Sequence, residues 1–135
     1  MNIYSGSFVR LDIQKFRKDF KEILIWQRSH QFTLDIYKIS VTFPAEEKFG
    51  LTSQIRRASY SIPTNIAEGC GRNTEADMSR FFIIAMGSAS ELEYQLLLVK
   101  DLGYLPSSAY NLLLNELIKI KKMLNAFIQK LRKSN

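Results

Sequence analysis

The sequence has little of the chemistry that metal sites, disulfides and nucleophilic catalysis need. Its 135 residues include one cysteine, Cys70, and one histidine, His30. One cysteine cannot form an internal disulfide, and one cysteine with one histidine falls short of the ligands of a dedicated zinc site. A paired-iron site in a helical bundle needs Glu-x-x-His pairs, and no glutamate stands three residues before His30. We therefore expect no metal and no cofactor.

Long apolar runs and a leader pattern are also missing. No uninterrupted apolar stretch approaches the length of a membrane span, and the first residues, MNIYSGSFVRLDIQK, carry charge where a signal peptide has its apolar stretch. We predict a cytoplasmic protein that does not enter a membrane. The length and the 46% hydrophobic content suit one domain with a real core and are too small for two.

Strand patterns are almost absent, and helical periodicity takes their place. Four helical stretches run from about 25 to 42, 52 to 68, 73 or 74 to 101, and 107 or 108 to 132. The first carries residues at helical spacing, namely Trp26, Thr33, Ile36, Tyr37 and Ser40. Because short loops between long helices make neighbours antiparallel, we predict an all-α, up-and-down four-helix bundle over 22–135. Residues 1–21 lie outside this pattern and are expected to form an N-terminal extension or arm.

The stretch SIPTNIAEGCGR, residues 61 to 72, places a proline inside the second helix. Pro63 removes one backbone hydrogen bond there, and the nearby hydroxyls are expected to satisfy the freed backbone groups. Those hydroxyls belong to Ser59, Ser61 and Thr64. Gly69 is expected to cap the C-terminus of the helix. The proline and the glycine are therefore interpreted as structural.

Glu68 is the residue of this stretch that a scaffold role explains least. A carboxylate in the last turn faces the negative end of the helix dipole, so it should have a basic partner. The candidate partners are Arg72, Arg56 and Arg57. We interpret Glu68 with Arg72 as a structural pair rather than as a catalytic group, since charge pairs of this kind also occur in scaffolds.

The third helix is apolar on two faces. One is an ordinary core stripe: Met78, Phe81, Ala85, Ser88, Ala89, Leu92, Leu96 and Val99. The opposite stripe includes Ile83, Met86, Tyr94, Leu97 and Leu98. A four-helix bundle covers only one face of a helix well, so the second face predicts an interface between copies of the chain. The alternative is a third helix buried on both faces within a monomer.

Positive charge is concentrated in the fourth helix. The net charge is +6, and no acidic residue occurs from Lys119 to the C-terminus. Four lysines share the face opposite the apolar one, namely Lys119, Lys122, Lys130 and Lys133. Such a row is expected to contact phosphates without base selectivity. Arg56 and Arg57 of the second helix are second candidates. A solvated helix face that serves solubility explains the row as well.

Catalytic patterns are not found. A Cys-His nucleophile would require Cys70 and His30 to meet beside an orienting group, and neither a strand-turn-helix elbow nor a phosphate-cradling glycine loop occurs in the sequence. We therefore predict a protein without catalytic residues that is not an enzyme.

Three stretches carry a family resemblance in one collinear order. They are IWQRSHQFTLDIYKIS, FGLTSQIRRASYSIPTNIAEGCGR and FFIIAMGSASELEYQLLLVKDLGYL. Over about residues 20 to 130 the chain resembles the four-helix bundle family of 23S rRNA-intervening sequence proteins, which is encoded within bacterial large-subunit rRNA genes and includes accessory proteins of diversity-generating retroelements. The resemblance implies a bundle that assembles into a ring, typically a pentamer, with a basic surface proposed to bind nucleic acid or a reverse transcriptase.

Two hypotheses follow from the residues and the resemblance together. The first is a homo-oligomeric protein that binds RNA or DNA through the lysine row. The second is a protein-interaction scaffold, for example for a reverse transcriptase or another polymerase, that does not bind nucleic acid. Dependence of binding on salt separates the two, because phosphate contacts weaken as salt rises.

Overall fold

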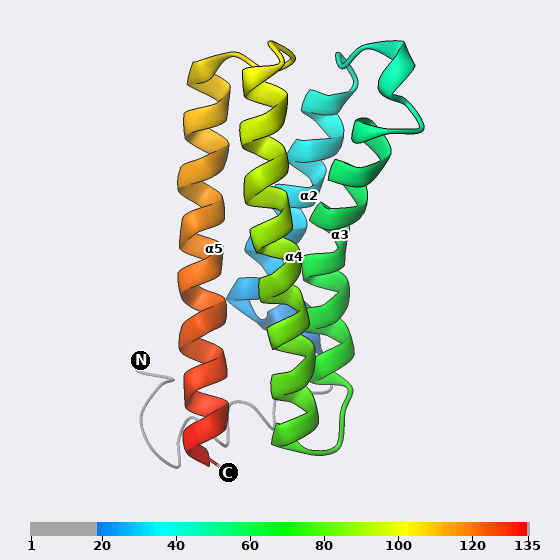
Figure 1. Ribbon diagram of the computed structural model, residues 1–135. Helices are drawn as coiled ribbons and strands as arrows, with labels where there is room; N and C mark the ends of the chain where they lie inside the picture. The colour runs from blue at the N-terminus through cyan, green and yellow to red at the C-terminus, as the bar shows by residue number, and fades with distance from the viewer. Residues whose placement is uncertain (1–18, 135) are drawn as a thin grey trace.

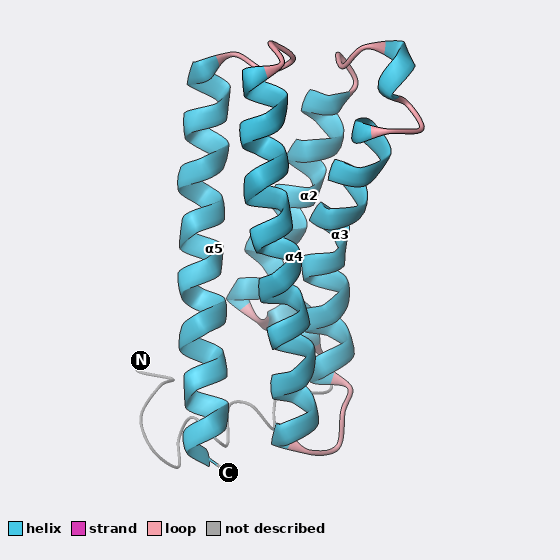
Figure 2. Ribbon diagram, viewed as in Figure 1, coloured by secondary structure: helices cyan, strands magenta, loops and turns pink. Residues whose placement is uncertain are grey.

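The computed structural model of the protein describes residues 19–134. Its helices are η1 (Phe20–Glu22), α2 (Leu24–Ser40), η2 (Ala45–Glu47), α3 (Leu51–Cys70), α4 (Glu75–Asp101) and α5 (Ser107–Ser134). No strand occurs among these residues, and the four long helices run alternately up and down, joined by short loops (Figures 1 and 2). The predicted all-α bundle is confirmed, and each predicted helix end lies within two residues of the observed one.

The helices occupy the corners of the bundle in chain order. α3 packs most extensively against α4, α4 against α5 and α2 against α3, while α2 and α5 close the bundle with a smaller contact. α3 and α5 therefore stand at diagonal corners. Residues 1–18 lie outside the described part of the chain, so the predicted arm over 1–21 stays a prediction. Within it, the Phe20 ring packs edge-on against Trp26 with centroids 4.9 Å apart.

The core is a single cluster that all four helices share. Its largest fully buried side chains are Phe32, Phe82, Ile25, Ile36, Ile55, Ile62, Ile66, Met78, Leu92, Leu96 and Leu117. Fully burying one such side chain stabilises a fold by about 1.5–3 kcal/mol. This shared core fixes the orientation of every helix, and hence which side chains reach the surface.

The ends of α4 follow local sequence signals. The Thr74 hydroxyl accepts a hydrogen bond from the backbone N–H of Asp77 at 3.1 Å, as expected for an N-cap. At the other end, Gly103 has a φ of +81°, a left-handed conformation that favours glycine. The N–H of Tyr104 bonds to the carbonyl of Val99, and the N–H of Gly103 bonds to that of Lys100, both at 2.9 Å. This pair of bonds is the Schellman arrangement that ends a helix.

Gly69 does not cap α3 as the sequence predicted. It lies buried inside the helix, and the C-cap is Gly71. A Cβ added at Gly69 would lie 3.0 Å from Cδ1 of Phe82 and 3.1 Å from the carbonyl oxygen of Met78. Gly69 is therefore the point at which α4 approaches α3 too closely for any side chain.

Pro63 lies inside α3 as predicted, but the freed backbone group has a different partner. A proline at 63 leaves the carbonyl of Ser59 without its helical donor. The hydroxyl of Thr33, on α2, lies 3.0 Å from that carbonyl and 3.0 Å from the carbonyl of Ser29, and its single proton is shared between the two. The hydroxyl of Ser59 instead donates to the backbone carbonyl of Arg56. The prediction that hydroxyls of α3 itself would satisfy this carbonyl is wrong, because the donor comes from the neighbouring helix α2.

Replacing Thr33 by valine should therefore destabilise the bundle by about 2 kcal/mol, because it keeps the shape and leaves the buried Ser59 carbonyl unsatisfied. The measurement is urea-induced unfolding of the variant beside wild type. The matched control is Thr42→Val, since the exposed Thr42 hydroxyl donates only to a carbonyl of its own turn. Equal stability of Thr33→Val and wild type would contradict the role assigned to Thr33.

Glu47 ties together the two loops at one end of the bundle. Its carboxylate accepts a hydrogen bond from the backbone N–H of Leu51 at 3.2 Å and one from the Tyr104 hydroxyl at 3.0 Å. The hydrogen bond to Glu47 raises the pKa of the Tyr104 phenol, with desolvation and the charge of Glu47 acting in the same direction. The loop before α3 is thus held to the loop before α5.

The raised pKa of Tyr104 predicts a pH dependence of stability. The folded state holds the phenol proton more tightly than the unfolded state, so the contribution is complete below the ordinary pKa of about 10 and is lost as pH rises through the higher folded pKa. The difference in unfolding free energy between wild type and Tyr104→Phe should be constant at neutral pH and shrink above about pH 10. A difference that grows with pH would contradict this assignment.

α4 is long and apolar enough, by length and composition alone, to cross a membrane. α4 meets this measure through its average hydropathy, although polar residues interrupt its apolar stretches, so the expectation that no uninterrupted apolar run reaches this length is not contradicted. A core helix of a bundle passes the same test, and α4 is the helix with the most extensive packing against both of its neighbours. Its composition follows from having two apolar faces, of which the inner one fills the core.

Candidate functional site

The lysine row lies on the outer side of α5. Leu117, Ile120 and Leu124 point into the core and are completely buried. The opposite side therefore faces solvent, and Lys119, Lys122 and Lys133 are exposed there. Three amines on one straight helix face form a row of positive charge.

Two neighbouring lysines differ from this row. Lys130 is half-buried and makes an interaction within the protein. Lys121, which the periodicity leaves out of the row, donates to the Glu93 carboxylate of α4 at 2.9 Å. The exposed row thus consists of Lys119, Lys122 and Lys133, with Lys130 at its edge.

Arg56 and Arg57 do not share the face of the lysine row. They belong to α3, which stands diagonally across the bundle from α5. The Arg56 guanidinium donates to the Ser40 hydroxyl at 2.7 Å and to the Tyr37 carbonyl at 3.3 Å, and it lies over the Tyr37 ring. Arg56 therefore completes the C-terminus of α2, while Arg57 is exposed. Contact of either arginine with nucleic acid stays a prediction, for a surface separate from the row.

The second apolar face of α4 is open to solvent in a single copy of the chain. Ile83 is 44% exposed, Tyr94 62% and Leu97 39%, and Met86 and Leu98 are half-buried. The alternative of a helix buried on both faces within the monomer is therefore wrong. We call this exposed face the α4 ridge; it comprises Ile83, Ile84, Gly87, Ser90, Tyr94 and Leu97.

The boundary between the two faces of α4 lies slightly away from its expected position. Phe82, which is not among the predicted core residues, is completely buried, whereas Phe81, expected in the core, is half-buried. Ile84, not named in the predicted interface, is 44% exposed. The Arg72 and Arg80 guanidinium groups lie over the Phe81 ring, 4.5 and 5.0 Å from its centroid. Phe81 is therefore covered by charged side chains rather than by another helix.

The predicted partner of Glu68 is Arg72. Their side chains form an ion pair of 3.2 Å, and both are about half exposed. Exposed pairs of this kind contribute about 0–1 kcal/mol. The predicted ion pair is therefore present at the last turn of α3, and its structural rather than catalytic role stays a prediction.

An open aromatic groove between α2 and α3 was not recognised in the sequence. It has a volume of about 710 Å³ and is lined by Phe20, Trp26, His30, Thr33, Tyr37, Tyr60, Pro63, Thr64, Ala67 and Glu68. Trp26 and Tyr37 stand at its edge rather than in the core, and the His30 ring stacks on Trp26 with centroids 4.9 Å apart. We call it the α2–α3 groove. The spacing of Trp26, His30 and Tyr37 by four and then seven positions, which places three rings on one face of α2, was the available signal.

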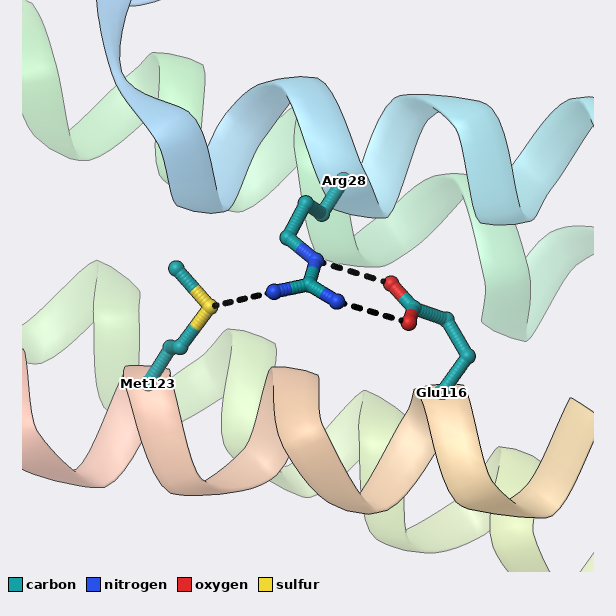
Figure 3. A network of polar contacts seen from close by, with 3 residues as sticks. All are labelled: Arg28, Glu116 and Met123. Atoms are coloured by element: carbon teal, nitrogen blue, oxygen red, sulfur yellow. Dashed lines mark hydrogen bonds and ion pairs between the residues drawn. The ribbon is translucent and has the colours of Figure 1, made fainter.

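An ion pair between Arg28 and Glu116, which was also missed in the sequence, links α2 to α5. These two helices share the least extensive contact among neighbouring helices of the bundle. The Arg28 guanidinium donates to both carboxylate oxygens of Glu116, at 3.0 and 2.9 Å, and lies 3.9 Å from the Met123 sulfur (Figure 3). Hydrogen bonding to Glu116 raises the pKa of Arg28. The bidentate geometry aligns the two helices.

The residues that catalysis would need are not brought together. Cys70 is completely buried in the core, whereas His30 is exposed in the α2–α3 groove. Within residues 19–134, no group of three or more His, Cys, Asp or Glu side chains could hold a metal ion. The features of the described surface that bear on binding are a basic row, an apolar ridge and an aromatic groove.

Comparison with known proteins gives a family. The model of the 23S rRNA-intervening sequence protein family matches residues 21–126. The chain belongs to this family. The crystal structure of a protein of unknown function from the S23 ribosomal protein family of Bacteroides thetaiotaomicron VPI-5482 is 29% identical, with a TM-score of 0.73, and the match covers 78% of this chain and 96% of that one. No curated protein matches the chain.

The family match confirms the resemblance seen in the sequence and includes the α4 ridge, the α2–α3 groove apart from Phe20, and part of the lysine row. Lys119 and Lys122 lie within the matched residues, whereas Lys130 and Lys133 lie beyond them. Neither the family description nor the solved structure names an enzymatic activity.

Proposed function

We propose that this member of the 23S rRNA-intervening sequence protein family is a non-enzymatic, homo-oligomeric protein that binds RNA or DNA through the outer face of α5. The observation that carries the proposal is the row of exposed lysines Lys119, Lys122 and Lys133, in a segment without acidic residues. Amines spaced along a helix contact phosphates as point charges and read no base.

Assembly strengthens such a weak site. We propose that the α4 ridge is an interface between copies and that the copies form a ring, for which a pentamer is the form the family resemblance implies. An apolar face of this kind, rimmed by polar residues, is typical of an interaction surface. Repeating one lysine row around a ring raises avidity for a long polyanion, because the second contact becomes intramolecular.

The test is binding of the purified protein to labelled single- and double-stranded RNA and DNA across a salt titration. We expect affinity to fall steeply with salt, with a slope that counts the phosphates contacted. Negligible binding at low salt would contradict the proposal and assign the row to solubility. Salt-insensitive capture of a polymerase-type protein, without nucleic-acid affinity, would favour the scaffold hypothesis instead.

A further inference from the structure

The α4 ridge and the α2–α3 groove have matching patterns. We infer that the ridge of one copy packs into the groove of a second copy, so that each subunit gives its ridge to one neighbour and receives the ridge of another. This inference rests on the proposed assembly and names the two surfaces that build it.

The first argument is the spacing of the side chains. Along the ridge, Ile83, Gly87, Ser90, Tyr94 and Leu97 follow one another by four and three positions alternately. Along α2, the groove residues Trp26, His30, Thr33 and Tyr37 follow the same alternation, and Tyr60, Thr64 and Ala67 do so along α3. This is the spacing of a seam through which one helix packs against others. The two rows, side by side on α2 and α3, form a groove into which the ridge of a third helix can pack.

The second argument is the glycine in the middle of the ridge. A glycine inside a helix costs about 1 kcal/mol relative to alanine. A Cβ added at Gly87 would meet nothing within 4 Å in the single chain, so the fold of one subunit gives no reason for it. Close approach of another helix gives such a reason, and the groove offers the large rings of Trp26, Tyr37 and Tyr60 opposite this small position.

The third argument is charge complementarity. α4 carries Arg80 and Glu91 on one side of the ridge, and α3 carries Arg57 and Glu68 along the groove; in each pair eleven residues separate the two charges. Eleven residues make three helical turns, so each pair lies on one face about 16 Å apart. Arg80 pairs with Asp77 and Glu68 pairs with Arg72, yet Arg80 and Glu68 are each at least half exposed. Arg57 and Glu91 are exposed and form no ion pair with another described residue.

The order of these charges selects one orientation of the subunits. α3 and α4 are antiparallel and joined by one short turn (Figure 1). Glu68 and Arg80 therefore lie nearer that turn, and Arg57 and Glu91 lie farther from it. Two subunits that point the same way bring Arg80 to Glu68 and Glu91 to Arg57, whereas subunits that point in opposite directions bring like charges together.

This orientation makes the contact heterologous. The ridge and the groove are different patches of one surface, so the contact repeats head to tail and closes into a ring when the rotation allows. Lys119, Lys122 and Lys133 belong to neither patch.

The test blocks one surface at a time and then mixes the variants. Gly87→Trp fills the ridge where a single chain has open space, and Tyr60→Glu places a charge in the groove at a side chain that is 43% exposed. By light scattering, wild type should have the mass of several chains and each variant that of one 15.6 kDa chain. An equal mixture should form a complex of two chains, because one intact ridge meets one intact groove. An unchanged far-UV circular dichroism spectrum and a single cooperative unfolding transition of each variant serve as the folding control, because loss of assembly alone lowers the melting temperature.

Other outcomes would overturn the inference. A mixture that stays at the mass of one chain, or single variants that keep the mass of wild type, would show that ridge and groove do not pair, while leaving the proposed assembly standing. Wild type at the mass of one chain would overturn both. Charge reversal tests the orientation: Arg57→Glu and Glu91→Arg should each lower the assembled fraction, and the two together should restore it. Failure of the double variant to recover would overturn the parallel arrangement.

Discussion

Replacing Lys119, Lys122 and Lys133 together by glutamine is expected to lower the affinity for nucleic acid on the order of 100-fold at low salt. The substitution leaves a flexible polar side chain at each position and removes three exposed charges from one helix face. The slope of log affinity against log salt should also fall by about 3 for duplexes, because each lost phosphate contact removes about 0.9 from it. The measurement is fluorescence anisotropy with labelled RNA and DNA at several salt concentrations.

The matched control removes the same charge elsewhere. Lys21, Lys38 and Lys48 are all exposed and lie outside α5. Their replacement by glutamine should leave the salt slope close to that of wild type. Equal losses in the two triple variants would mean that net charge alone governs binding. Lys130→Gln, tested singly, should have a smaller effect than any member of the row, because Lys130 is half-buried and makes an interaction within the protein.

Replacing Gly69 by valine is expected to destabilise the bundle by about 3 kcal/mol, in the upper part of the range for overpacked cores. Even a single Cβ there would lie 3.0 Å from the Phe82 ring and 3.1 Å from the Met78 carbonyl oxygen, and the latter is backbone that cannot turn aside. For a chain of this size the loss corresponds to a melting temperature lower by about 10 °C. Thermal unfolding followed by circular dichroism measures it.

Gly71 provides the control for this prediction. A Cβ there would have an ordinary contact of 3.5 Å with the Glu68 carbonyl oxygen, and its φ of −86° suits any residue. Gly71→Ala should therefore change the melting temperature little. A melting temperature of Gly69→Val equal to that of wild type would contradict the claim that the close approach of α4 requires a glycine at position 69.

The sequence predicts the helices well because their ends depend on local signals. Thr74 caps α4 through its own hydroxyl, and Gly103 supplies the left-handed residue that ends it. Both effects act within a few residues along the chain. The number and direction of the helices then follow from the short loops.

The errors arise where the cause lies on another helix. Gly69 lies where the sequence suggests a helix cap. The position needs a glycine because the Phe82 ring of α4 packs directly against it. The donor that satisfies the Ser59 carbonyl is Thr33, 26 positions earlier in the chain and on a neighbouring helix. Such partners become visible only when the helices are placed side by side.

The faces of α4 show a different limit. With apolar residues all around the helix, a small error in phase exchanges a core position for a surface one, as it did for Phe81 and Phe82. Likewise, the arginine pair of α3 and the lysine row of α5 look like one basic surface in the sequence. Their diagonal placement separates them, and Arg56 is held by Ser40 and Tyr37.

The most direct test of the proposed function is the reactivity of each lysine toward an acetylating reagent, measured by mass spectrometry with and without bound RNA. The unmodified wild-type protein is used, so folding and assembly stay intact. The proposal predicts that RNA protects Lys119, Lys122 and Lys133, while Lys38 and Lys48 react as before. Protection confined to Lys38 and Lys48, or no protection of α5 at RNA concentrations that saturate binding, would contradict it.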